Sequence, residues 1–214
     1  FASHQSFLGL NGNNRVIHEE DFVGDGVEDK NGHGTHVAAL AAGGEGATNS
    51  GLANYRGTAP DADIISLRVL DENGASTSST VIDALSWVMA NHNSYNIRVV
   101  NLSLGTKAVE SYRTDPLCNA VRQLADAGIV VVAAAGNDGK DVSGNKVYGG
   151  IHSPGNDPSV LTVGASNSFA TDARDDDAVA TYSSRGPTRS FYVDSDNVKR
   201  YDNLIKPDLV APGN

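Results

Sequence analysis

Two histidines stand three residues apart in the segment Asn31–Leu40, NGHGTHVAAL, where a small-residue helix is predicted to begin. Three roles compete for His33: metal ligand, catalytic base, or a structural position at a helix start. Two histidines are too few for a zinc site, and the sequence offers no obvious third ligand nearby. Gly32 and Gly34 let another group approach the His33 ring closely, which suits a general base at the mouth of a cleft. His36, one turn further on, is predicted to face the interior as a structural histidine.

Two further segments place polar groups where chemistry needs them. In VVVAAAGND a strand of valines ends in small residues, and the amide of Asn137 follows. Gly-Asn is a common turn dipeptide, so a plain turn competes with the functional interpretation, an amide donor aimed at developing negative charge. In NLSLG, Gly105 would let an extended peptide backbone come close after Ser103, and an ordinary turn is the alternative. Each segment alone leaves both interpretations open.

The elements that must position these groups alternate along the chain. Near-continuous apolar runs predict buried parallel strands at 62–70, 97–105, 128–137 and 159–166. Helical spacing predicts helices at 80–91 and 116–127, the second capped by Asp115 and ended by Gly128. This order predicts an α/β fold, a doubly wound parallel sheet with helices on both faces. Active sites in such sheets lie beyond the carboxyl ends of the strands, which selects Ser103–Gly105 and Ala134–Asn137.

Length, net charge and hydropathy limit the classes of partner that the protein can bind. The length of 214 residues suits one domain over residues 1–214. With 16 Lys and Arg against 26 Asp and Glu, the net charge is −10, and the scattered basic residues argue against nucleic acid as a partner. No apolar run approaches the roughly 18 residues of a membrane span. The single cysteine, Cys118, is predicted to be a buried small hydrophobe, and the polar stretches 43–57 and 188–203 are predicted to be surface loops.

Seven motifs, in this order, resemble the subtilisin-like serine proteases over nearly the whole chain: NGHGTHVA, GTAP, NLSLG, VVVAAAGND, SPGNDPSVLTVGA, YSSRGP and IKPDLVAPG. A nucleotide-binding α/β domain is excluded because GGEGATNS lacks the P-loop lysine. The combination therefore favours the protease family over the other functions that an α/β fold can host.

The resemblance implies a serine endopeptidase of broad specificity, monomeric and secreted, that acts on proteins or peptides. It implies that His33 is the triad histidine and Asn137 the side-chain donor of the oxyanion hole. By the same resemblance, Ser103, Leu104 and Gly105 pair with bound substrate, and Ala134, Ala135 and Gly136 wall the specificity pocket. Asp138 would add a slight preference for basic side chains.

The chain departs from the family pattern at both ends. The resemblance places the triad aspartate before Phe1 and the nucleophilic serine, in a GTSMA segment, after Asn214. We therefore expect a central fragment that is inactive by itself, and assign neither Ser183 nor Ser184 of the SSRGP turn as nucleophile. A catalytically inactive relative that serves as a binding module is the alternative.

Metal binding has weaker support in the sequence. SHQSF, at residues 3–7, lacks the aspartate that many relatives use as a calcium ligand. The acidic loop Glu19–Asp29 is expected to be a solvated surface rather than a calcium site. The chemistry implied by the resemblance needs no cofactor, and a structural calcium has no clear ligand set.

Overall fold

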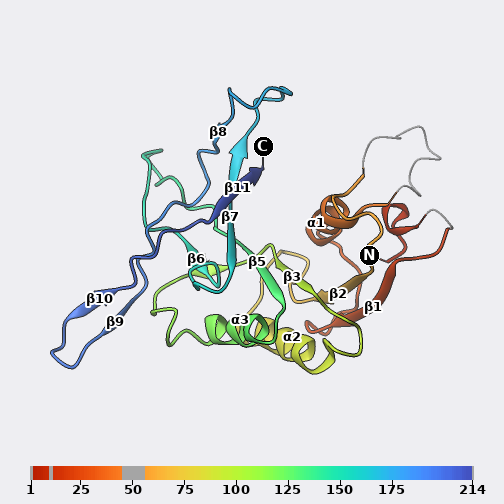
Figure 1. The fold of residues 1–214 in the computed structure, drawn as a ribbon, viewed down its shortest axis with the longest axis horizontal. Helices are drawn as coiled ribbons and strands as arrows, with labels where there is room; N and C mark the ends of the chain where they lie inside the picture. The colour runs from red at the N-terminus through yellow and green to blue at the C-terminus, as the bar shows by residue number, and fades with distance from the viewer. Residues whose placement is uncertain (1, 10–11, 45–55, 214) are drawn as a thin grey trace. The chain divides into compact units, whose positions relative to one another are not determined.

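The computed structural model of the chain describes residues 2–9, 12–44 and 56–213 (Figure 1). The chain divides into two units, Phe1–Ala84 and Leu85–Asn214, each with its own parallel strands. Most of the surface loop predicted at 43–57 lies outside the described residues. None of the helices in the described ranges is both long enough and apolar enough to cross a membrane.

The first unit is built on two parallel strands, β1 (Val16–Asp21) and β2 (Ile64–Arg68). A short 3-10 helix, η1 (Gln5–Phe7), precedes them, and helix α1 (His33–Ala42) lies between them in the chain. Phe7 is fully buried. The Arg15 guanidinium donates hydrogen bonds to the carbonyl oxygens of Ala62 and Ala42, at 2.7 and 2.6 Å, and so joins the start of β2 to the end of α1.

The strands predicted at 97–105, 128–137 and 159–166 lie in the main sheet of the second unit, together with β8 (Ala178–Val179) and β11 (Leu209–Pro212), which the sequence analysis did not predict. In order across this five-stranded sheet lie β11, β7 (Leu161–Asn167), β5 (Val130–Ala134) and β3 (Val99–Leu102), all parallel. β8 pairs with β7 in the antiparallel direction. The α/β class with a parallel sheet is therefore confirmed, and the single antiparallel strand makes the sheet mixed.

Two helices follow the predicted pattern. α2 (Ser78–Asn91) crosses the boundary between the units, and α3 (Pro116–Asp126) packs against β5. Asp115 caps α3 as predicted, because its Oδ1 accepts hydrogen bonds from the N–H groups of Leu117 and Cys118 at 2.8 and 3.2 Å. Gly128 follows with φ of 85°, a left-handed conformation that glycine adopts without strain.

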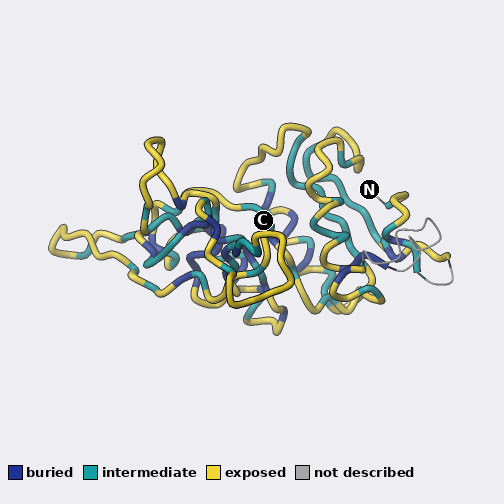
Figure 2. Tube along the Cα trace, turned by 90° about the horizontal axis from the view of Figure 1, so that it is seen from above, coloured by how far each residue is buried: buried dark blue, intermediate teal, exposed yellow. Residues whose placement is uncertain are grey.

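The core of the second unit includes the contact of α3 with β5. Leu117, Cys118, Val121 and Leu124 are buried on α3, and Val131 and Ala133 are buried on β5. Figure 2 shows the buried stretches of the chain in dark blue. Burial raises the pKa of the Cys118 thiol to about 12, so this cysteine is an inert core residue, as predicted. Its sulfur lies 3.2 Å from Oδ1 of Asn156.

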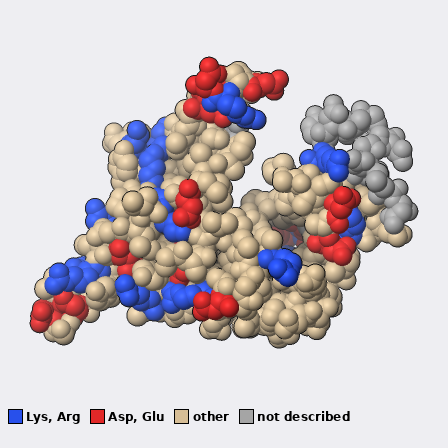
Figure 3. Space-filling view, in the orientation of Figure 1, with Lys and Arg blue, Asp and Glu red and all other residues tan. Residues whose placement is uncertain are grey.

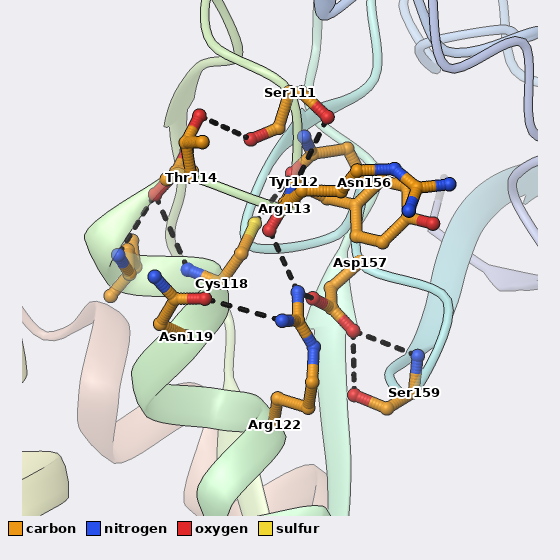
Figure 4. Close-up of polar contacts among 12 residues, drawn as sticks. Ser111, Tyr112, Arg113, Thr114, Cys118, Asn119, Arg122, Asn156, Asp157 and Ser159 are labelled. Atoms are coloured by element: carbon orange, nitrogen blue, oxygen red, sulfur yellow. Dashed lines mark hydrogen bonds and ion pairs between the residues drawn. The ribbon is translucent and has the colours of Figure 1, made fainter. Parts of the chain in front are cut away.

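An ion pair between a half-buried arginine and a buried aspartate anchors the segment that follows the short strand β6 (His152–Ser153). The Arg122 guanidinium of α3 donates to Oδ2 of Asp157 at 2.5 Å and to the carbonyl oxygen of Tyr112 at 2.7 Å (Figure 4). Asp157 is fully buried, and its Oδ1 accepts hydrogen bonds from the backbone and hydroxyl of Ser159. The pair thus ties the residues after β6 to α3.

The polar stretch 188–203 differs from the predicted loop. It contains an antiparallel hairpin of β9 (Phe191–Val193) and β10 (Lys199–Tyr201), whose aromatic and basic side chains favour strand pairing across the turn. Lys199 lies over the Phe191 ring, and Arg200 pairs with Asp194 at 2.7 Å. Figure 3 shows acidic and basic side chains next to one another at this hairpin.

Candidate functional site

His33 is the first residue of α1 and is exposed. The preceding Gly32 has φ of 84°, in the left-handed region, which explains glycine at this position. Glycine has no side chain that could accept a hydrogen bond at the cap position. The free N–H groups at the start of α1 therefore need another acceptor.

Asp29 supplies that acceptor. Its Oδ1 accepts a hydrogen bond from the Gly32 N–H at 2.9 Å, and its Oδ2 accepts from the backbone N–H and the hydroxyl group of Thr35, both at 2.7 Å. Burial alone would raise the pKa of Asp29, but these hydrogen bonds to the carboxylate outweigh it and lower the pKa below its ordinary value. Asp29 thus holds the turn that presents His33.

No residue of the acidic loop 19–29 is buried, and its aspartates also form local hydrogen bonds and an ion pair. Besides Asp29, Oδ2 of Asp21 accepts from the Gly26 N–H at 2.6 Å and Oδ1 from the Val23 N–H at 2.9 Å. Asp25 forms an ion pair with Arg68. An aspartate three residues before the glycine of a helix start is the local signal, an Asx-type turn, that would have identified Asp29 from the sequence.

His36 is exposed, which corrects the prediction that it faces the interior. Among the described side chains of α1 only Ala42 is buried, at the last turn of the helix. The small residues of α1 are therefore closely packed at the C-terminal end of the helix, and its described side chains form no continuous buried face.

The carboxyl ends of the second unit's strands surround a hollow of about 350 Å³. Five of the predicted site residues line it: Ser103, Ala134, Ala135, Gly136 and Asn137. The hollow is completed by residues of β7 and β11 and by Tyr182, whose hydroxyl donates to the Gly213 carbonyl at 2.6 Å. Strand β5 ends at Ala134, so Asn137 lies beyond it and is exposed. An amide there can donate a hydrogen bond to an anionic group bound in the hollow.

Leu104 and Gly105 stand outside that lining and lead into strand β4 (Thr106–Lys107), which pairs with β6. A Cβ built on Gly105 would lie 3.0 Å from Cβ of His152, so glycine is what lets the two segments approach. Nε2 of His152 lies 2.8 Å from Oδ2 of Asp138. Sequence reasoning did not single out His152, because no pattern in the sequence links it to its partner 14 residues away.

Ser183 and Ser184 have structural roles. Each is 1% exposed. The Ser183 hydroxyl oxygen accepts from the Ala165 N–H and that of Ser184 from the Asp138 N–H, both at 3.0 Å. Buried hydroxyl groups engaged by the backbone are poor nucleophiles, in agreement with the sequence analysis.

Comparison with known proteins identifies what this arrangement is similar to. Residues 7–214 match the Subtilase family. The chain is 40% identical over 207 residues to Serine protease AprX of Bacillus subtilis (strain 168), which covers 93% of this chain and 42% of AprX. It is 37% identical over 166 residues to Extracellular serine proteinase of Thermus sp. (strain Rt41A), 78% of this chain and 34% of that protein. The chain thus spans less than half the length of these relatives.

Solved structures show the same fold. Sphericase superposes with a TM-score of 0.71 at 28% identity, covering 99% of this chain and 62% of that one. A cold adapted subtilisin-like serine proteinase gives a TM-score of 0.64 at 29% identity, covering 99% of this chain and 59% of that one. The parallel sheet and helices described above are therefore those of a subtilisin-like fold.

Proposed function

Because this chain belongs to the subtilase family, we propose that it is part of a serine endopeptidase domain. The observation that carries the proposal is the hollow at the strand ends, where Ser103 and residues 134–137 come together. A wall of small residues with one exposed amide suits a peptide whose carbonyl oxygen gains negative charge during attack.

In the proposed mechanism His33 is the general base. It takes the proton from a serine hydroxyl as that serine attacks the peptide carbonyl, and returns it to the leaving amine. The exposed position of His33 at the start of α1, held by Asp29, supports this role because a base must be reachable and fixed. The GTSMA segment that carries the family's nucleophile does not occur in the 214 residues, so we assign that serine and the triad aspartate to other parts of the full-length protein.

Asn137 is the proposed oxyanion donor. An amide already in place bonds more strongly to the tetrahedral intermediate than to the substrate, which lowers the barrier without tightening substrate binding. Ser103, Leu104 and Gly105 are proposed to pair with the substrate backbone, and Ala134, Ala135 and Gly136 to wall the pocket for its side chain. Small residues there suit large apolar side chains and broad specificity.

The proposed substrates are proteins and peptides, the proposed state is a monomer, and the chemistry requires no cofactor. Relatives from Thermus and Bacillus subtilis are named extracellular proteases, and we extend secretion to this protein as part of the proposal.

The test uses the full-length protein with a general peptide substrate and a serine-directed phosphonyl reagent. We expect turnover that the reagent abolishes by labelling one serine outside residues 1–214. Residues 1–214 expressed alone should give no turnover, because they supply a base and an oxyanion donor without the nucleophile. A full-length protein that binds peptides without cleaving them would contradict the proposal and favour an inactive binding module.

A further inference from the structure

His152 is fixed in the second unit by its own backbone. Its N–H donates a hydrogen bond to the Ala135 carbonyl at 3.0 Å, and its carbonyl accepts one from the Asn156 N–H at 2.9 Å. In the β4–β6 pair, His152 stands opposite Lys107. The ion pair of Arg122 with the fully buried Asp157 then holds the residues that follow. The Cα of residue 152 therefore has little freedom to move relative to the end of β5.

The imidazole ring occupies the space beside Gly136, the residue before Asn137. A Cβ built on Gly136 would lie 2.6 Å from Cδ2 and 2.7 Å from Cγ of the ring, far inside any carbon contact. Gly136 also has φ of 103°, a conformation suited to glycine. The backbone before Asn137 thus lies directly against the ring.

The same ring binds the residue after Asn137. Nε2 of His152 lies 2.8 Å from Oδ2 of Asp138, and because a carboxylate only accepts, Nε2–H is the donor. The His152 side chain is 20% exposed and the Asp138 side chain 58%. Ser184 adds two main-chain bonds: its N–H donates to the Gly136 carbonyl and its hydroxyl accepts from the Asp138 N–H, both at 3.0 Å.

We propose that His152 is a positioning residue for Asn137. By packing against Gly136 and binding Asp138, it holds both neighbours of Asn137 and keeps the amide directed at the site of developing charge. This inference rests on the proposed function, in which Asn137 stabilises the oxyanion. A donor stabilises a transition state only if it is in place beforehand, so loosening its neighbours should reduce catalysis more than substrate binding.

The test compares steady-state kinetics of full-length variants on one peptide substrate. His152→Ala should lower kcat about 10- to 100-fold with KM nearly unchanged, a cost typical of a displaced catalytic group. His152→Gln should recover most of the loss, because its amide donor reaches a position similar to Nε2. Asp138→Ala, a change at an exposed side chain with little risk to folding, should lower kcat less. His18→Ala is the matched control: it removes another histidine–carboxylate pair, His18 with Glu20 at 3.1 Å, and should leave kcat unchanged.

The decisive measurement is a double-mutant cycle with Asn137→Leu. If His152 acts through Asn137, then His152→Ala should cause no further fall in kcat in the Asn137→Leu background. Additive losses, an unchanged kcat for both His152→Ala and Asp138→Ala, or a raised KM at constant kcat would each overturn the positioning role. An unchanged kcat for Asn137→Leu alone would instead overturn the oxyanion assignment of the proposed function, and the inference with it. Melting temperatures establish that the compared variants are folded.

Discussion

Oδ2 of Asp29 binds both the backbone N–H and the hydroxyl group of Thr35, each at 2.7 Å, and so closes the turn from which α1 begins. The carboxylate acts on the helix as a capping side chain would, although it stands before the glycine that occupies the cap position. Because Asp29 binds the backbone on both sides of His33, at Gly32 and at Thr35, the backbone position of His33 is fixed.

The first prediction concerns the stability that Asp29 contributes. Asp29→Asn should lower the free energy of unfolding at pH 7 by about 1 kcal/mol, because an amide has one acceptor oxygen and loses part of the hydrogen bonds that the two carboxylate oxygens accept. The pKa of Asp29 is lowered in the folded protein, so its contribution is complete above its ordinary pKa of about 3.9 and is lost as the pH falls through the folded value.

Urea unfolding between pH 7 and pH 2 measures this effect. The difference in unfolding free energy between the original protein and Asp29→Asn should shrink as the pH falls below about 4. The adjacent, exposed Glu28 provides the control: Glu28→Gln should change stability little at any pH. A difference that stays constant down to pH 2 would contradict the assigned hydrogen bonds.

The second prediction separates the two histidines of α1. In the full-length protein, His33→Ala should lower kcat by about 10⁶-fold, the order of magnitude measured for the triad histidine of a subtilisin, a member of the same family. His36→Ala is the matched control from the same helix. Because His36 is exposed, this change should shift the unfolding free energy by less than about 0.5 kcal/mol and leave activity intact. Loss of turnover in His36→Ala with an active His33→Ala would reverse the assignment.

The third prediction tests Asn137. Asn137→Leu keeps the approximate size and removes the donor, so kcat should fall about 10²- to 10³-fold while KM barely moves; this magnitude was also measured on a subtilisin. If Asn137 were only a turn residue, stability would fall instead and kcat would stay nearly normal. Steady-state kinetics and thermal melting of one variant distinguish these results. Asn93→Leu, at an exposed position after α2, is the control for an added leucine.

The fourth prediction concerns the ion pair of Arg122 with the buried Asp157, which follows β6 in the chain. Arg122→Ala should lower the free energy of unfolding by about 3–5 kcal/mol, because it leaves the fully buried Asp157 carboxylate without its guanidinium partner. Arg113 and Arg122 both lie over the Tyr112 ring, 5.2 and 5.5 Å from its centroid, but within the described ranges Arg113 forms no ion pair with a buried carboxylate. Arg113→Ala should therefore cost only about 0.5–1 kcal/mol. Equal effects of the two changes in denaturant unfolding would rule out a special role for the pair.

Much of the fold follows from local sequence. The apolar runs at 97–105 and 128–137 contain β3 and β5 as predicted. The prediction that both faces of these strands are covered is wrong, because burial alternates along β5 and only Leu102 of β3 is buried. Helix α3 begins at Pro116 and ends one residue before its predicted end, because Asp115 and Gly128 act on neighbouring backbone groups. The motif order also established the family, which the comparison with known proteins confirms.

Other features depend on contacts that no local pattern encodes. The pairing of β4 with β6 brings His152 against Gly105 and Gly136 and within hydrogen-bond distance of Asp138, although these residues are far apart in the chain. The exposure of His36 depends on which residues pack over α1, and helical spacing predicted the wrong side. The sequence by itself determined the elements, the family and the candidate groups, since these rest on neighbours in the chain. Only the tertiary structure decided what surrounds each group, because packing joins residues that the chain keeps apart.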